Sequence, residues 1–133
     1  MQLIRGLHNL PGFQDKLAQG CVLTIGNFDG VHRGHAEVIA ALVKKAKQLK
    51  VPATLMTFGY NPVIGKWSTF HGAAYAVLES VSKIAAMGGD VSNIRLTFQE
   101  YFEKLGKDET RWGKPLAALL GAYYAQKCLE IPA

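Results

Sequence analysis

Residues 21–35, CVLTIGNFDGVHRGH, constrain the fold of this chain more than any other segment. An apolar run at 22–25 has the length of a buried strand, and a glycine-rich turn follows it. The turn ends at His32 and His35, where the pattern of an amphipathic helix begins. A strand that leads into a helix N-terminus in this way presents backbone N–H groups to a phosphate. The segment therefore predicts an α/β fold with an anion site after the first strand.

The first half of the chain predicts a strand, a helix and a second strand. The helix is expected at residues 35–49, and Pro52 separates it from an apolar strand at 53–58. Such a unit has parallel strands and a right-handed crossover. The helix should turn one apolar stripe toward the core, formed by Val38, Leu42, Ala46 and Leu49 and widened by Ile39 and Val43.

The second half continues the alternation of helix and strand. A helix is expected at 70–87, ended by Gly88 and Gly89, followed by a third strand at 94–98. Residues 99–105 either extend that strand or form a short helix, and residues 63–68 are left unassigned. A final helix should begin at Pro115 and run to about residue 129. Its apolar residues are Leu116, Leu119, Leu120, Tyr123 and Tyr124.

The complete pattern is β-α-β-α-β-α. It predicts one three-layer α/β domain over residues 1–133, with helices packed on a small, mostly parallel three-stranded sheet. Strand orders 2-1-3 and 3-2-1 both agree with the pattern. In the first of them the turn before His32 lies at a switch point of the sheet.

Composition limits the classes of partner. A net charge of +5 in 133 residues favours an anionic ligand. The lysines at 44, 45, 47 and 50 are expected on a solvated helix face, and no aromatic residues alternate with them, so no specific nucleic-acid partner is predicted. The two cysteines are expected to be buried and reduced. No apolar run suggests a signal peptide or a membrane span, which predicts a cytoplasmic protein without a membrane partner.

The turn contains the candidate site residues. Gly26, Gly30 and Gly34 allow the backbone to approach a phosphate closely. His32 and His35, three positions apart, share a face in the first helical turn and are the candidate catalytic residues. Two imidazoles there can stabilise charge on a leaving pyrophosphate, usually with Mg²⁺ on the phosphates and without a covalent intermediate. No metal ligands are predicted among the protein side chains.

The motif GNFDGVHRGH resembles the signature of the HxGH nucleotidyltransferases. With LIRGLHNL before it, residues 1–58 are similar to the N-terminus of the bacterial bifunctional riboflavin kinase/FMN adenylyltransferase family. The resemblance implies that His32 and His35 contact ATP phosphates, with Mg²⁺ as cofactor. It also implies a nucleotide- and flavin-side loop and the conversion of ATP and FMN to FAD and pyrophosphate. That loop comprises Gly26, Asn27, Phe28 and Asp29.

Residues 59–133 resemble a different family. GYNPVIGKWSTFHGAAYAVLESVSKIAAMGGD and the segment beginning IRLTFQEYFEKLGKDETRWGK look like an internal stretch of phosphoribosylformylglycinamidine synthase, the ATP-dependent amidotransferase of purine biosynthesis. That resemblance implies a metal-binding acid at Glu79, with His71 near the start of the same helix. The residues alone also agree with a solvated Glu79 and with a His71 that binds no ligand. The tetrapeptide at 59–62 replaces the acidic-Pro-His-Pro turn of the first family, so a join is predicted near Phe58–Gly59.

The two resemblances lead to three functional hypotheses. The first is a chimeric or engineered domain that keeps a nucleotide-phosphate-binding turn but has no evolved catalysis. The alternative is an FMN adenylyltransferase-type enzyme. The second alternative is an interaction module that forms a homo-oligomer through exposed sheet edges.

Overall fold

The computed structural model describes residues 20–28, 30 and 32–133. Two strands form a parallel sheet, in a register that pairs Val22 with Ala53 and Ile25 with Met56. Helices account for most of the other described residues. In chain order the elements are β1 (Val22–Ile25), α1 (Arg33–Leu49), β2 (Ala53–Met56), α2 (Pro62–Trp67), α3 (Thr69–Ala86), a 3₁₀ helix (Val91–Asn93) and α4 (Glu109–Leu129).

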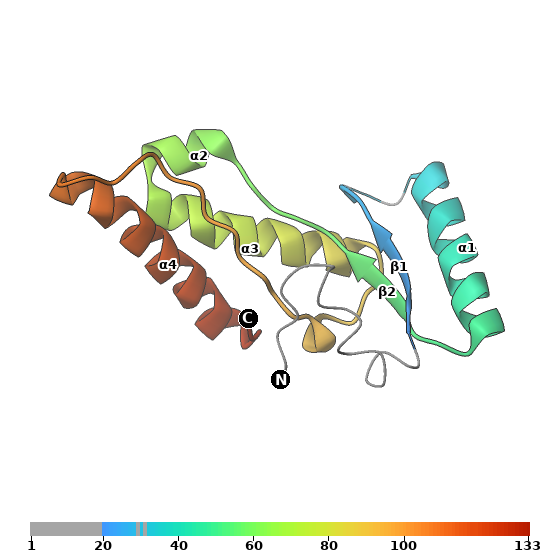
Figure 1. The fold of residues 1–133 in the computed structure, drawn as a ribbon. Helices are drawn as coiled ribbons and strands as arrows, with labels where there is room; N and C mark the ends of the chain where they lie inside the picture. The colour runs from blue at the N-terminus through green and yellow to red at the C-terminus, as the bar shows by residue number, and fades with distance from the viewer. Residues whose placement is uncertain (1–19, 29, 31) are drawn as a thin grey trace.

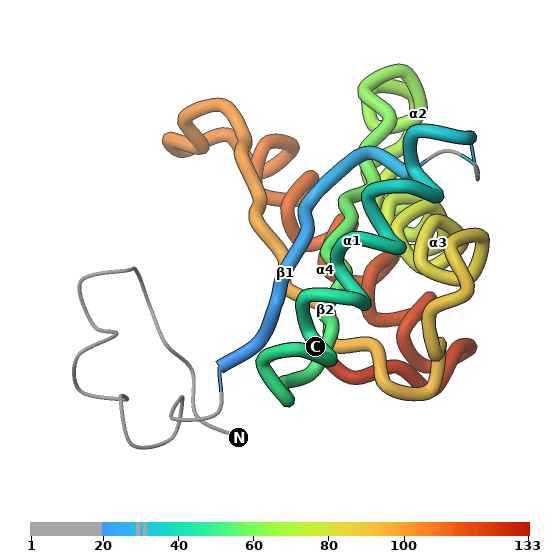
Figure 2. Tube along the Cα trace, turned by 90° about the vertical axis from the view of Figure 1, so that its right-hand side faces the viewer, coloured from blue at the N-terminus to red at the C-terminus, as the bar shows by residue number. Residues whose placement is uncertain are grey.

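The α/β class with a small parallel sheet is confirmed. In Figure 1 the sheet lies between α1 and the C-terminal end of α3, and α4 lies at the other end of the molecule. Figure 2 looks at the molecule from the α1 end. The prediction of the α1 face that packs on the core is confirmed at the centre of the helix, where Leu42 and Ala46 are buried. Its ends are open: Val38 is 46% exposed and Leu49 is 54% exposed.

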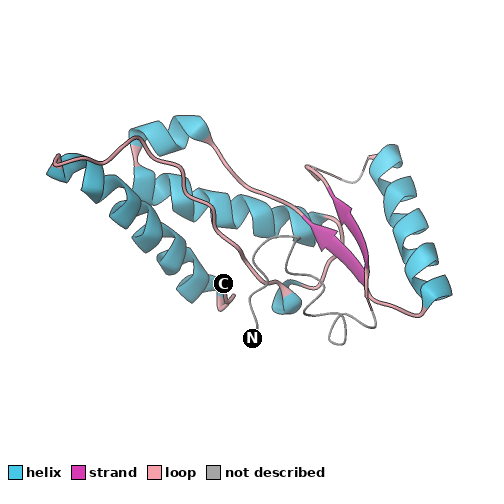
Figure 3. Ribbon diagram, in the orientation of Figure 1, coloured by secondary structure: helices cyan, strands magenta, loops and turns pink. Residues whose placement is uncertain are grey.

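The predicted third strand at 94–98 is wrong, and the sheet contains two strands, β1 and β2. Residues 94–108 form an extended connection instead (Figure 3). It is required because α3 and α4 run in the same general direction, so the chain must return along them before α4 begins (Figure 1). Ile94 and Leu96 pack on the α3–α4 core, which explains the alternating pattern. Their backbone is not paired with β1 or β2; instead, the Leu96 N–H donates a hydrogen bond to the Pro132 carbonyl at 3.1 Å.

The extended connection is fixed where it reaches α4. The Arg111 guanidinium donates to the Lys104 carbonyl at 3.0 Å, and the Trp112 indole donates to the Gly106 carbonyl at 3.0 Å. Lys114 pairs with Glu103, and this hydrogen bond lowers the pKa of the Glu103 carboxyl. These contacts hold the N-terminal half of α4 against the connection that precedes it.

The main core lies between α3 and α4 rather than on the sheet. Small residues of α4 allow the two helices to approach closely, and Val77 and Val81 of α3 fill the contact. The buried members of this core are Val77, Val81, Ala122, Ala125 and Ile131. The sheet, by contrast, leaves apolar side chains in contact with solvent, among them Leu23, Ile25 and Met56.

Capping residues set the helix starts that the sequence analysis misplaced. Asn61 caps α2 by accepting from the N–H groups of Val63 and Ile64, with Pro62 in the first turn, so the unassigned residues 63–68 are largely helical. Asp108 caps α4 by accepting from the Thr110 N–H at 3.0 Å. The final helix therefore begins six residues before Pro115, at Glu109, and Pro115 lies inside it.

The large apolar residues of α4 are exposed, because the helix turns its small residues toward α3. The predicted burial of the cysteines is wrong. Both cysteines, Cys21 and Cys128, are exposed, since each lies near an element end outside the core. The four lysines at 44, 45, 47 and 50 lie on exposed positions of α1 and its C-cap, as predicted.

The segment after β2 is bound to α3 by polar contacts. Thr57 Oγ1 donates to the Ser80 carbonyl at 2.9 Å. Lys83 Nζ donates to the Phe58 carbonyl at 2.9 Å and to Glu79 Oε1 at 2.6 Å. The Glu79 carboxylate also accepts from the Tyr60 N–H at 3.1 Å. Glu79 therefore serves as an ion-pair partner that ties the end of β2 to α3.

Candidate functional site

The turn after β1 is built around one buried aromatic ring. The Gly26 N–H donates to the Met56 carbonyl at 3.1 Å, which continues the pairing of the strands into the turn. Phe28 is 3% exposed, and a Cβ placed on Gly26 would lie 3.0 Å from its Cζ atom. The ring therefore fills the space beside Gly26, and the turn has no room for a larger residue there.

The same ring supports His35. The two rings meet edge to face with centroids 5.2 Å apart. His35 Nδ1 lies 2.7 Å from the Gly30 carbonyl oxygen. Because a carbonyl only accepts, this bond requires the proton on Nδ1 and leaves Nε2 as the ring nitrogen for a ligand. Phe28 and Gly30 thus set both the orientation and the tautomer of His35.

His32 lies at the N-cap of α1, next to His35. Its backbone is extended, with φ −77° and ψ 160°, and its side chain forms no capping hydrogen bond with the helix. Its carbonyl accepts from the Ala36 N–H at 2.9 Å. The two imidazole centroids are 5.5 Å apart. The structure thus brings His32 and His35 together at the helix start, where the helix dipole favours a negative charge.

The remaining turn residues differ in their surroundings. A Cβ on Gly30 would meet His32 Nε2 at 3.6 Å, whereas one on Gly34 would meet nothing within 4 Å. Asn27 is exposed on the turn. Asp29 lies outside the described residues. The open space over Gly34, in the first turn of α1, is where a phosphate can approach the backbone.

Gly26→Ala is expected to lower the free energy of unfolding by about 1–2 kcal/mol, because the methyl group displaces the Phe28 ring. Gly34→Ala is the matched control: nothing meets its Cβ, so it should stabilise α1 by up to about 1 kcal/mol. Urea denaturation followed by circular dichroism measures both. Equal changes for the two variants would contradict the packing of Phe28 beneath Gly26.

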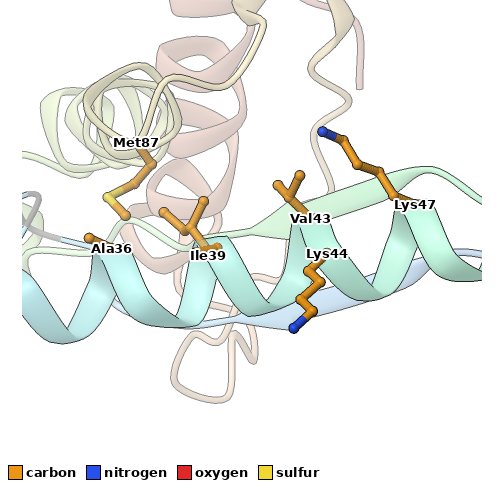
Figure 4. A pocket seen from close by; sticks show the side chains of 7 residues that line it. Ala36, Ile39, Val43, Lys44, Lys47 and Met87 are labelled. Atoms are coloured by element: carbon orange, nitrogen blue, oxygen red, sulfur yellow. The ribbon is translucent and has the colours of Figure 1, made fainter.

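A shallow groove of about 630 Å³ runs along another face of α1 (Figure 4). Ala36, Ile39 and Val43 form its apolar floor, and the Met87 side chain points toward Ala36 and Ile39. Lys44 and Lys47 also contribute to its lining. The groove contains neither His32 nor His35. It marks the place where α1 meets the end of α3.

The synthase-like segment places its own candidate residues apart from this turn. His71 lies in the first turn of α3, where its Nδ1 is 2.8 Å from Ser68 Oγ. The centroids of the His71 and Trp67 rings are 5.3 Å apart. Among the described residues, no three His, Cys, Asp or Glu side chains are grouped to hold a metal ion. The metal-binding role that the resemblance implied for Glu79 has no support in its contacts, which are those of an ion pair.

Sequence reasoning missed two structural roles at these places. It assigned Phe28 to the ligand loop and did not foresee that the ring is buried and supports His35. It also missed the pair between Lys83 and Glu79, although their spacing of four residues on a helix is a recognisable signal. The burial of Phe28 also had a signal in the sequence, which is a phenylalanine two positions after a glycine in a polar turn.

Comparison with known proteins assigns the family. The family model described as FAD synthetase matches residues 14–109. The bifunctional riboflavin kinase/FMN adenylyltransferases of Haemophilus influenzae and Pseudomonas fluorescens are each 52% identical over 62 residues. That of Escherichia coli K12 is 46% identical over 63 residues. Each match covers 47% of this chain and 19% of the relative. No solved structure matches.

This chain belongs to the FAD synthetase family, and it spans about a fifth of the length of these relatives. The match continues through Phe58 and Gly59 to residue 109, so the comparisons give no support to the predicted join or to a purine-biosynthesis segment. None of the helices in residues 20–28, 30 and 32–133 combines the length and apolar character that a membrane crossing requires.

Proposed function

We propose that the turn at residues 26–35 binds the phosphates of ATP and serves an adenylyl transfer to FMN, which yields FAD and pyrophosphate. The observation that carries the proposal is the pair of imidazoles at the uncapped start of α1, His32 and His35, with open space over Gly34. Family membership supports the nucleotide and the flavin as substrate classes.

In this proposal the protein acts by position and charge. Backbone N–H groups in the first turn of α1 bind a phosphate, and the imidazoles donate to its oxygens. His35 donates through Nε2 in its imidazolium form, because Nδ1–H is already directed to the Gly30 carbonyl. The charge that develops on the leaving pyrophosphate is then stabilised at the helix N-terminus. Mg²⁺ accompanies ATP as part of the substrate and neutralises its phosphate charge.

The proposal assigns different roles to the four residues of the loop, Gly26, Asn27, Phe28 and Asp29. Gly26 and Phe28 shape the turn through packing, as their contacts support. Asn27, which is exposed, is proposed to contact the nucleotide or the flavin. Asp29 is proposed for the same loop from the resemblance alone.

We expect MgATP binding, measured by titration calorimetry, to weaken at least tenfold in His35→Ala, the loss of one charge-assisted contact of about 1.5 kcal/mol or more. His71→Ala is the matched control, because its imidazole lies at the start of another helix, and it should bind as the unchanged protein does. Equal binding by all three proteins, or binding by none, would contradict the phosphate site.

The transfer step needs a separate measurement. Incubation with FMN, MgATP and inorganic pyrophosphatase, followed by chromatography of the flavins, should produce FAD, and His35→Ala should produce less. ATP binding without any FAD would contradict the transfer and leave nucleotide binding alone, which is the outcome expected for a domain without evolved catalysis.

The domain organisation is a further part of the proposal. We propose that residues 1–58 and 59–133 form one domain from two segments. Extensive contacts within the described chain fall into two groups, one of β1, β2 and α1 and the other of α2, α3 and α4. The Lys83–Phe58 hydrogen bond and its neighbours join the groups. A chimeric origin, a cytoplasmic location and the absence of a specific nucleic-acid partner stay predictions.

A further inference from the structure

One face of α4 exposes large apolar side chains. The opposite face, with Ala118, Gly121, Ala122 and Ala125, is buried. The exposed residues recur at spacings of three and four, so they form one stripe along the helix. This stripe, called here the outer face of α4, consists of Trp112, Leu116, Leu119, Leu120, Tyr123 and Tyr124, which are 51–59% exposed.

The outer face is as large as the largest apolar patches, about 300–600 Å², that a single soluble chain exposes. Aromatic side chains offer about 150–250 Å² each, so its half-exposed aromatic residues alone present about 350 Å² of apolar surface. Its leucines raise the total to the order of 600 Å², at the upper end of that range, where apolar patches commonly have a function. A standard interface buries about 800 Å² per partner, so the outer face approaches the area that a stable dimer needs.

We propose that the outer face of α4 binds the outer face of a second copy of this chain, with the two helices antiparallel about a twofold axis. This surface is distinct from the sheet edges that the sequence suggested. In an isologous pair, residue i of one copy faces residue j of the other and the reverse. One alignment of the two antiparallel helices gives favourable contacts at both ends of α4.

Charge selects that register. Glu109 in the first turn and Lys127 in the last turn are about five helical turns apart, so they lie on the same side of α4. Glu109 is about one turn before Trp112 and Lys127 about one turn after Tyr123, so the two charges flank the outer face at its ends. Neither forms an ion pair with another residue of the described chain. Antiparallel pairing places each Glu109 opposite Lys127 of the second copy, and parallel pairing would place like charges together. The antiparallel arrangement also opposes the two helix dipoles.

The same register matches shapes between the ends. Leu116 faces Leu120 of the second copy, and Trp112 faces Tyr124, an aromatic pair. Tyr123 faces Gly113, where an added Cβ would meet nothing within 4 Å, so the glycine leaves room for the phenol ring. Apolar contacts thus fill the centre, and the charged pairs lie at both ends.

The first test is the mass of the full chain by analytical ultracentrifugation over a concentration series up to about 100 µM. We expect reversible dimers with a micromolar dissociation constant. A strict monomer across the series would overturn the proposal and assign the outer face to a different protein, and a larger assembly would overturn it as well.

The second test separates the outer face from other exposed apolar residues. Tyr123→Glu should weaken the dimer at least tenfold, because it introduces a charge at the contact. Tyr101→Glu is the matched control: Tyr101 is 87% exposed and lies outside the helices, and the dimer should keep its dissociation constant. Helicity measured by circular dichroism verifies that both variants fold. Equal weakening by the two substitutions, or weakening by neither, would overturn the proposal.

The third test reads the direction of the helices. Glu109→Lys and Lys127→Glu should each weaken the homodimer about tenfold, since each creates two like-charge contacts by symmetry. A mixture of the two single variants should form a heterodimer with restored affinity, as should the double variant with itself. In a parallel pair neither single substitution removes an attractive contact, so homodimers of unchanged affinity would overturn the antiparallel register; the mixture alone does not decide, because opposite charges would also meet in a parallel heterodimer.

Discussion

Gly121→Ala is expected to destabilise this protein by about 2–3 kcal/mol. Gly121 lies where α4 meets the start of α3, and a Cβ there would overlap the Phe70 carbonyl oxygen and lie 2.8 Å from its carbonyl carbon. Both obstacles are backbone atoms, so relief requires the two helices to separate. Separation opens the contact of Val77 and Val81 with the small face of α4.

Gly113→Ala is the control for this prediction. It makes the same substitution in the same helix, but its Cβ meets nothing within 4 Å. Alanine favours a helix over glycine by about 0.8–1 kcal/mol, so this variant should be slightly more stable. Urea denaturation of both variants, at a concentration at which the chain is monomeric, measures the difference. If Gly121→Ala were as stable as Gly113→Ala, the close approach of α3 and α4 at Phe70 would be wrong.

Lys83→Met is expected to cost about 2 kcal/mol. Lys83 is 8% exposed, and its ammonium group donates to the Phe58 carbonyl and to Glu79 and lies 5.1 Å from the centre of the Phe58 ring. Methionine keeps the length of the side chain but leaves the carbonyl without this donor. Because Glu79 is 39% exposed, solvent screens the ion pair, and the lost carbonyl hydrogen bond dominates the cost.

Two further variants locate that cost. Glu79→Gln removes the ion pair but keeps the Phe58 hydrogen bond, so it should cost less than about 1 kcal/mol. Lys66→Met, on an exposed position of α2, should change the free energy of unfolding by no more than about 0.5 kcal/mol. Thermal unfolding of the full chain compares them. A loss in Glu79→Gln as large as in Lys83→Met would show that the ion pair carries the stability.

Local pattern was sufficient for the first half of the fold. The apolar run of β1, the amphipathic pattern of α1 and the apolar run after Pro52 are decided within each segment, and all three elements formed. The helix begins at Arg33 rather than at residue 35, and β2 ends at Met56 rather than at residue 58. The extended segment with Ile94 and Leu96 also matches a strand pattern. Whether such a segment becomes a strand depends on a neighbouring strand edge, which is a tertiary property absent from the local sequence.

The orientation of α4 could not be predicted from its sequence. The helix has both a small-residue face and a large apolar face, and the local pattern does not decide which of them packs on α3. The structure buries the first, because alanine and glycine allow the backbones of α3 and α4 to approach closely. At the turn, spacing was enough to bring His32 and His35 together, but the support of His35 by Phe28 depends on burial that spacing does not encode.

The parallel course of α3 and α4 has a kinetic consequence. Helices joined by a short loop form a hairpin from neighbouring residues, but here Val77 meets Ala122 only after the extended connection has been laid along both helices. The contacts of the core join residues separated by roughly 45 positions, so much loop entropy is lost before the core forms. Contacts between residues so far apart in the chain are expected to slow folding relative to a bundle of helices joined by short loops, although most contacts between elements here are between helices.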